Sequence, residues 1–233
     1  MTALFNRLHP PEKQAVYLHL IFALICLIVL FMPLKIAVGI KMLFLVILYN
    51  IMVPVWGRLR KDLIWVNIWL FALILSVFQV FPDWFLAAQL DILVFPEDGC
   101  FKIGAVSGYM AGLWAIPIFI AVFIGDRIRL RYSPLAAYWV VGVVSLLLFA
   151  GSEQTLWILP AWHAKNVLMI GHTAVYILIP EIIFGLAAFF AYQQTKNSPI
   201  WQKIAAAFLV MQLYLGSAAF FYFIIEKLIL NIT

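Results

Sequence analysis

The chain has few charges and few cysteines. Only 11% of its 233 residues are charged, whereas 67% are apolar, and the mean hydropathy is +1.08. A soluble domain of this size could not shield so much apolar surface from water, so lipid must be the solvent for most of the chain. The two cysteines, Cys26 in the first apolar run and Cys100 in a linker, indicate no disulfide framework.

Long apolar runs without polar alternation make up most of the sequence. Backbone groups in hydrocarbon need internal hydrogen bonds, which leaves a helix bundle or a closed barrel, and unbroken runs favour helices. The formal net charge of +5 comes from short Lys and Arg clusters between these runs, which membrane topology explains without a nucleic-acid partner. The sequence therefore predicts an all-α integral membrane bundle.

The apolar runs are close to the length of about 20 residues that crosses a bilayer. We expect a single transmembrane domain over residues 1–233 with seven spans, at about 16–34, 38–56, 63–82, 107–125, 134–152, 167–191 and 204–225. The basic start of the chain is typical of a signal peptide, but the run after it is long enough to span and has no small-residue cleavage site. We therefore interpret it as the first span, beginning near Pro10 and Pro11.

Basic residues gather on one side of these spans. The positive-inside rule makes that side cytoplasmic. We expect a multipass protein of the cell (inner) membrane, with the N-terminus in the cytoplasm and the C-terminus on the outer side, where two longer connections carry acidic residues. The basic side holds 10 of the 15 Lys and Arg residues: Arg7, Lys13, Arg58, Arg60, Lys61, Arg127, Arg129, Arg131, Lys196 and Lys203.

The connection from Asp83 to Val106 contains an apolar stretch, residues 85–95, that is too short to span. Apolar runs of about 10–14 residues are typical of re-entrant or interfacial segments. Irregular backbone at membrane depth needs cover from protein or a water-filled cavity, so one interpretation places this segment at the mouth of a cavity. The other interpretation is a plain amphipathic helix on the membrane surface.

Three glycines with a spacing of four, Gly104, Gly108 and Gly112, accompany the predicted fourth span. On a helix this spacing gives a smooth ridge that lets another helix approach closely. The ridge is the face that we expect a homo-oligomer to use.

Glu181 is the strongest candidate for chemistry. The predicted sixth span places it about midway, where an ionised carboxylate would cost several kcal/mol unless it were paired. The neutral acid is therefore favoured, and this is the form that a general acid needs. The alternative is a structural role, with Glu181 hydrogen-bonded to Asn50, Gln79 or Gln212 on other helices.

His163 and His172 precede Glu181 at intervals of nine residues. On one continuous helix the successive side chains would point to opposite faces, with the outer two about 27 Å apart, so they could not share a metal ion. Pro160 allows a break that folds His163 back. We expect the histidines to handle protons, to bind substrate or to make structural hydrogen bonds, and we expect no metal site.

The outer connection adds Asp91 and Asp98 as candidate acids, and aromatic residues are abundant near it. Most of these aromatic side chains fit an interfacial belt. An aromatic wall would also stabilise a developing carbocation through the ring quadrupoles, as prenyl cyclisation or hydration requires. The candidate substrate-binding residues are Phe95, Tyr109, Trp114, Trp162 and Tyr176.

Five short motifs stand out, at residues 90–104, 114–117, 162–164, 171–172 and 180–181. They resemble motifs of a small, uncharacterised family of bacterial multipass proteins of unknown function. More distantly, the layout resembles integral membrane carotenoid cyclases and hydratases and the membrane terpene cyclases, which are helical bundles that use buried carboxylates to protonate an alkene or an epoxide. The membrane lycopene cyclases carry two adjacent carboxylates after a proline, whereas here Ile182 follows Pro180 and Glu181.

We therefore expect a membrane-embedded enzyme that performs acid catalysis on a prenyl or other apolar lipid substrate. One alternative is a small-molecule transporter, which the lack of internal repeats disfavours. The other is a scaffold or assembly subunit of the membrane. The candidate catalytic residues are Asp91, Asp98, His163, His172 and Glu181.

Overall fold

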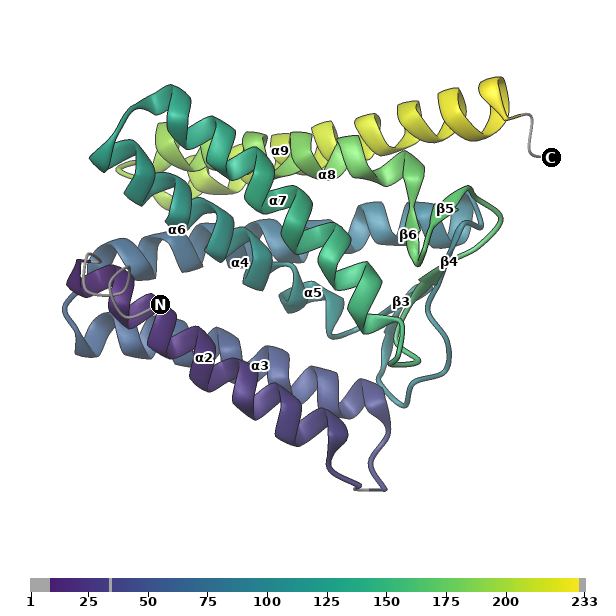
Figure 1. Ribbon diagram of the computed structural model, residues 1–233, viewed down its shortest axis with the longest axis horizontal. Helices are drawn as coiled ribbons and strands as arrows, with labels where there is room; N and C mark the ends of the chain where they lie inside the picture. The colour runs from purple at the N-terminus through teal and green to yellow at the C-terminus, as the bar shows by residue number, and fades with distance from the viewer. Residues whose placement is uncertain (1–8, 34, 231–233) are drawn as a thin grey trace.

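Seven helices in the described part of the chain are long and apolar enough to cross a membrane (Figure 1). The structure is a computed structural model that describes residues 9–33 and 35–230, so Arg7 and the last residue of the first expected span lie outside it. The prediction of an all-α bundle with seven spans is confirmed. The seven spans are built from the α-helices α2 (Pro10–Phe31), α3 (Val38–Leu59), α4 (Leu63–Trp84), α5 (Met110–Leu113), α6 (Ala115–Arg131), α7 (Pro134–Leu156), α8 (Leu178–Thr195) and α9 (Ile200–Tyr222), of which α5 and α6 share one span.

Three short helical stretches extend these helices. Helix α4 continues into a π-helical stretch, η1 (Phe85–Gln89), and α9 continues into another, η3 (Phe223–Ile229). A 3-10 turn, η2 (Val175–Ile177), leads into α8. The short α5 runs directly into α6, and together they make the fourth span.

Figure 1 shows α2 and α3 as a hairpin along one side of the bundle, with α6 to α9 on the other side and α4 between them. Helix α4 packs against α3, α6 and α9, and α7 packs against α6 and α8. Helix α2 packs mainly on α3 and is the least buried of the spans. Large apolar side chains such as Leu24, Trp139 and Leu209 remain exposed, as lipid-facing helices require.

The turns α3–α4, α6–α7 and α8–α9 lie at one end of the bundle, which we call the basic end because the clustered Lys and Arg residues lie there. Capping explains where these helices start and stop. The side chains of Asp62 and Ser133 each accept a backbone N–H in the first turn of α4 and α7, and Pro134 follows Ser133. The Lys203 ammonium donates to the carbonyl of Thr195, the last residue of α8, and to those of Lys196 and Ser198 just after it.

The opposite end, which we call the hairpin end, carries three antiparallel pairs of two-residue strands. Two of the pairs are local turns, whereas β1 and β4 join the α4–α5 connection to the α7–α8 connection. This pairing holds together two segments that are far apart in sequence. The pairs are β1 (Leu93–Val94) with β4 (His163–Ala164), β2 (Lys102–Ile103) with β3 (Val106–Ser107), and β5 (Met169–Ile170) with β6 (Thr173–Ala174).

The position expected for Glu181 was wrong. The predicted sixth span begins at residue 167, but residues 169–174 form the β5–β6 pair, whose turn contains Gly171 with a φ of 62°. Helix α8 begins only at Leu178, so Glu181 lies in its first turn near the hairpin end rather than midway along a span.

The expected glycine ridge was also wrong. Gly104, with a φ of 61°, makes the turn between β2 and β3, and Gly108 precedes α5, so only Gly112 is helical. A Cβ atom on Gly104 would lie 2.7 Å from the Trp84 ring, and one on Gly108 would lie 2.3 Å from the Phe101 ring. These glycines therefore serve close packing within the chain.

Candidate functional site

A cavity of about 310 Å³ lies inside the bundle, beneath the strands of the hairpin end. Helices α2 to α9 all contribute to its wall, and residues of the α4–α5 and α7–α8 connections close it. Its volume is at the lower end of the range of about 300–1,000 Å³ that is typical of small-molecule sites. Most of the lining side chains are apolar, among them Phe22, Leu45, Leu86, Leu93, Met110, Ile116, Phe149 and Leu156.

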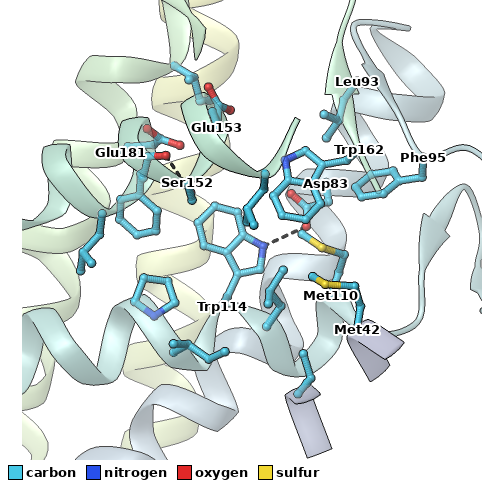
Figure 2. Close-up of a pocket in the computed structure, with 18 of the residues that line it drawn as sticks. Met42, Asp83, Leu93, Phe95, Met110, Trp114, Ser152, Glu153, Trp162 and Glu181 are labelled. Atoms are coloured by element: carbon cyan, nitrogen blue, oxygen red, sulfur yellow. Dashed lines mark hydrogen bonds between the residues drawn. The ribbon is translucent and has the colours of Figure 1, made fainter. Parts of the chain in front are cut away.

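Three carboxyl groups line this apolar cavity: those of Asp83, Glu153 and Glu181. Asp83 lies at the end of α4, Glu153 in the last turn of α7, and Glu181 in the first turn of α8. The side chains of Asp83 and Glu181 are only 2% and 3% exposed. Figure 2 shows the three groups around Trp114, with Glu153 and Glu181 on one side of the indole and Asp83 on the other.

Trp114 stands at the junction of α5 and α6 and partners one of these acids. Its indole Nε1 donates to Oδ2 of Asp83 at 2.9 Å, the dashed line beside Asp83 in Figure 2. The rings of Phe149, Phe184 and Tyr214 surround the indole, with centroids 5.4, 5.5 and 5.7 Å away. These contacts fix the indole beside the cavity and leave aromatic faces along its wall.

The two glutamates differ from Asp83 in the partners of their carboxyl oxygens. Oε2 of Glu153 and Oε2 of Glu181 are buried and have no hydrogen-bond partner within residues 9–33 and 35–230. The two carboxyl groups lie close enough to repel each other when both are charged. An unpaired charge is costly in such surroundings, so the arrangement favours the neutral form of the Glu181 carboxyl group, which lines the cavity.

Two tyrosines lie beside these acids. Tyr176 of η2 is close enough to Glu153 and Glu181 to interact with charges on their carboxyl groups. Tyr214 of α9 is similarly close to Glu181 and Asp83. Both side chains line the cavity and are buried. Together with Trp114 they add aromatic rings and hydroxyl groups to the cavity that the three carboxyl groups line.

The structure brings together five of the residues that the sequence singled out. Glu181 contributes a carboxyl group, while the other four supply aromatic rings from four segments of the chain. The α4–α5 connection, for which a cavity mouth was one of two interpretations, lines this cavity with residues from η1, β1 and the segment after it. The five residues are Glu181, Phe95, Trp114, Trp162 and Tyr176.

The two predicted acids of the α4–α5 connection lie away from the cavity wall. The side chain of Asp91 is 71% exposed, and its Oδ1 pairs with Nζ of Lys165 at 2.7 Å. Asp98 is buried, but Oδ1 accepts the N–H of Cys100 and Oδ2 accepts the hydroxyl of Ser107. Both of its oxygens are therefore used to shape the connection.

The predicted histidines and Tyr109 also lie outside the cavity wall. His163 is exposed on β4, and the exposed His172 ring stacks on Trp157 with centroids 4.1 Å apart. Tyr109 donates to the carbonyl of Ala161 at 3.2 Å, and burial, with a smaller effect of the Asp98 charge, raises the pKa of Tyr109 well above its usual value. No group of three or more His, Cys, Asp or Glu side chains in the described residues could hold a metal ion.

Sequence reasoning missed Asp83, Glu153 and Tyr214 as site residues. It treated the two acids as loop charges because the apolar runs were cut at residues 82 and 152, whereas α4 and α7 continue to Trp84 and Leu156. A usable signal was present at Asp83, which stands between Pro82 and the apolar residues 84–88. A lone acid within such a run is more typical of a buried group than of a solvated loop.

A family described as a domain of unknown function (DUF6989) matches residues 80–225, which is more than half of the chain. The matched region contains all three cavity carboxyl groups as well as Trp114 and Tyr214, whereas α2 and α3 lie outside it. No curated protein and no solved structure matches the chain. The resemblance to an uncharacterised family is confirmed, and the chain belongs to the DUF6989 family, a domain of unknown function.

Proposed function

We propose that the protein is a membrane-embedded enzyme that uses a buried carboxylic acid to protonate a carbon–carbon double bond of a prenyl or other apolar lipid substrate. The observation that supports this most is that Glu181 lines an apolar, aromatic-lined cavity inside the spans, with a buried Oε2 that has no hydrogen-bond partner among the described residues. An apolar site of this kind excludes water. Positive charge that develops on the substrate is then stabilised by the fixed dipoles and aromatic ring faces of the site.

The cavity residues divide the work of such a reaction. The O–H bond of Glu181 breaks as its proton forms a C–H bond with the π electrons of the alkene, which leaves a carbocation on the substrate and a carboxylate on Glu181. The faces of Trp114 and Tyr214 stabilise the cation through their ring quadrupoles. A second alkene of the same substrate then attacks the cation, or water adds to it.

The cycle closes when the substrate cation loses a proton. Glu153 lies next to Glu181 and has an unpartnered oxygen to accept it, after which the pair shares one proton again. Asp83 accepts the indole N–H of Trp114 and so holds that ring in place on the other side of the cavity. The net result is an isomerisation for cyclisation, or addition of one water for hydration, with no oxidant or reductant.

The test is turnover by the purified protein in lipid nanodiscs, with a panel of prenyl alcohols and polyenes in D₂O. Mass spectrometry should find a cyclised or hydrated product that carries deuterium from the solvent. General acid catalysis contributes about 10²–10⁴-fold, so Glu181→Gln should reduce turnover by at least about 100-fold while the protein still inserts and folds. Full turnover by this variant would refute the mechanism.

A matched control separates the site from the surface. Asp91→Asn removes an acid that is also on the hairpin side but is exposed and paired with Lys165. We expect this variant to retain turnover. Equal loss in both variants would indicate a general effect of charge removal rather than catalysis by Glu181.

We also propose an orientation in the cell (inner) membrane with the N-terminus in the cytoplasm and the C-terminus outside. The basic end would then face the cytoplasm, and the cavity would lie in the outer half of the bilayer. Fusion of a reporter that is active only outside the cytoplasm to the C-terminus should give activity, and the same fusion after Lys61 should not.

A further inference from the structure

A second cavity, of about 380 Å³, lies between α2 and α6 at the basic end. It shares only Ile120 with the candidate site, and none of the three cavity carboxyl groups lines it. We call it the α2–α6 groove. Its residues are Glu12, Ala15, Val16 and His19 of α2, and Ile120, Phe123, Ile124, Arg127, Ile128 and Arg131 of α6.

Two arginines one helical turn apart line the α2–α6 groove. Arg131 donates to Glu12 across the groove at 3.2 Å, and Arg127 donates to the neighbouring Asp126 at 2.8 Å. Each of these contacts uses one terminal nitrogen of a guanidinium that has five N–H donors. Nε of Arg127 is buried without a hydrogen-bond partner in the part of the chain that the structure describes. The two guanidinium groups therefore have N–H donors beyond those that contact Glu12 and Asp126.

The rest of the groove is apolar. Val16 of α2 faces a row of isoleucines from α6, and Phe123 lies beneath the Arg127 guanidinium at 5.4 Å from its ring centroid. His19 adds no free polar group, because one ring nitrogen contacts the carbonyl of Ala15 at 2.8 Å and the other contacts the hydroxyl of Tyr49 at 3.0 Å. An occupant must be anionic at one end and apolar along its length.

We infer that the α2–α6 groove binds one anionic phospholipid, with its phosphate on Arg127 and Arg131 and an acyl chain along the apolar wall. Arginine forks match phosphate oxygens, and basic pockets between spans are typical sites for anionic headgroups. A free phosphate would use the arginines but would leave the apolar wall uncovered. The lipid would also pack α2, the least buried span, against α6.

Native mass spectrometry of protein released from nanodiscs with equal phosphatidylglycerol and phosphatidylcholine tests the charged part of this site. The wild type should retain one phosphatidylglycerol. A basic residue near the membrane surface contributes about 1 kcal/mol, so Arg131→Gln should weaken binding about fivefold and the Arg127→Gln/Arg131→Gln pair about 30-fold. Arg129→Gln is the matched control, because Arg129 lies on the same helix but contacts Gln193 and does not line the groove.

The apolar part of the site is tested without a charge change. Val16→Trp should fill the groove and abolish lipid retention, whereas Leu20→Trp, one turn further along α2 at an exposed position that does not line the groove, should not. Thermal unfolding of each delipidated variant checks that it is folded, and this pair tests the site even if the arginine variants do not fold. Equal retention by Val16→Trp and the wild type, equal loss in Arg129→Gln and Arg131→Gln, or displacement of the lipid by inorganic phosphate alone would overturn the inference.

Discussion

Replacing Asp98 by alanine should destabilise the hairpin end rather than remove a catalytic acid. The carboxylate is 4% exposed, and it accepts the N–H of Cys100 at 2.9 Å and the hydroxyl of Ser107 at 2.6 Å. A hydrogen bond to a charged group contributes about 1.5–3 kcal/mol, so loss of both should lower the free energy of unfolding by about 3–6 kcal/mol.

A double-mutant cycle isolates the bond between the two side chains. We would measure unfolding in detergent for Asp98→Ala, Ser107→Ala and the double variant, and we expect a coupling energy of about 1.5–3 kcal/mol. Lys102 also donates to the Ser107 hydroxyl, at 2.9 Å, so Ser107→Ala alone should be destabilising as well. Asp91→Asn is the control, since an exposed ion pair contributes at most about 1 kcal/mol and asparagine tolerates the positive φ at this position.

The two roles of Asp98 predict opposite results. If Asp98 is structural, Asp98→Ala loses stability, and any remaining folded fraction keeps its turnover. A variant with unchanged stability, no coupling to Ser107 and no turnover would refute the structural account and would restore Asp98 as a catalytic residue.

Two further predictions concern the same end of the molecule. In thermal unfolding, Gly39→Ala should destabilise the protein by more than about 1 kcal/mol, because a Cβ atom would lie 2.4 Å from Oδ1 and 2.8 Å from the backbone oxygen of Asp98. Gly216→Ala in α9 is the control: a Cβ atom there meets nothing within 4 Å, so this variant should be stabilised by about 0.5–1 kcal/mol. Glu226→Ala should increase hydrogen exchange over residues 163–174, because both carboxyl oxygens of Glu226 accept the N–H of Leu168, at 3.1 and 3.0 Å; unchanged exchange would show that this contact does not hold the α7–α8 connection.

The spans were predictable because hydrocarbon forces every backbone group into a helix, and long apolar runs record that requirement directly. The expected start at Pro10 and the expected span at 38–56 agree closely with α2 and α3. The start of α8 was not predictable in this way. Residues 167–170 are as apolar as a helix, and apolarity alone does not distinguish a helix from a buried hairpin.

Most of the aromatic residues that line the cavity could be predicted from the sequence. Of the acidic residues that line it, only Glu181 was predicted. The aromatic candidates were chosen because rings gather near the outer acids in the sequence; Trp114 and Tyr176 do line the cavity, whereas Tyr109 does not. Asp91 and Asp98 look alike in sequence, but a positive φ of 54° turns Asp91 outward to Lys165, and local hydrogen bonds occupy Asp98. Such loop geometry depends on the folded connection rather than on spacing.

Chemical labelling tests most directly whether a neutral carboxyl group of Glu181 faces an apolar cavity. Dicyclohexylcarbodiimide adds to a protonated carboxyl group and gives a stable N-acylurea, which peptide mass spectrometry locates. We predict labelling of Glu181 in membranes, protection by an excess of prenyl alcohol, and no labelling of Glu226, whose buried carboxyl group is held by Leu168 outside the cavity. An unlabelled Glu181, or labelling that prenyl alcohol does not reduce, would contradict the account.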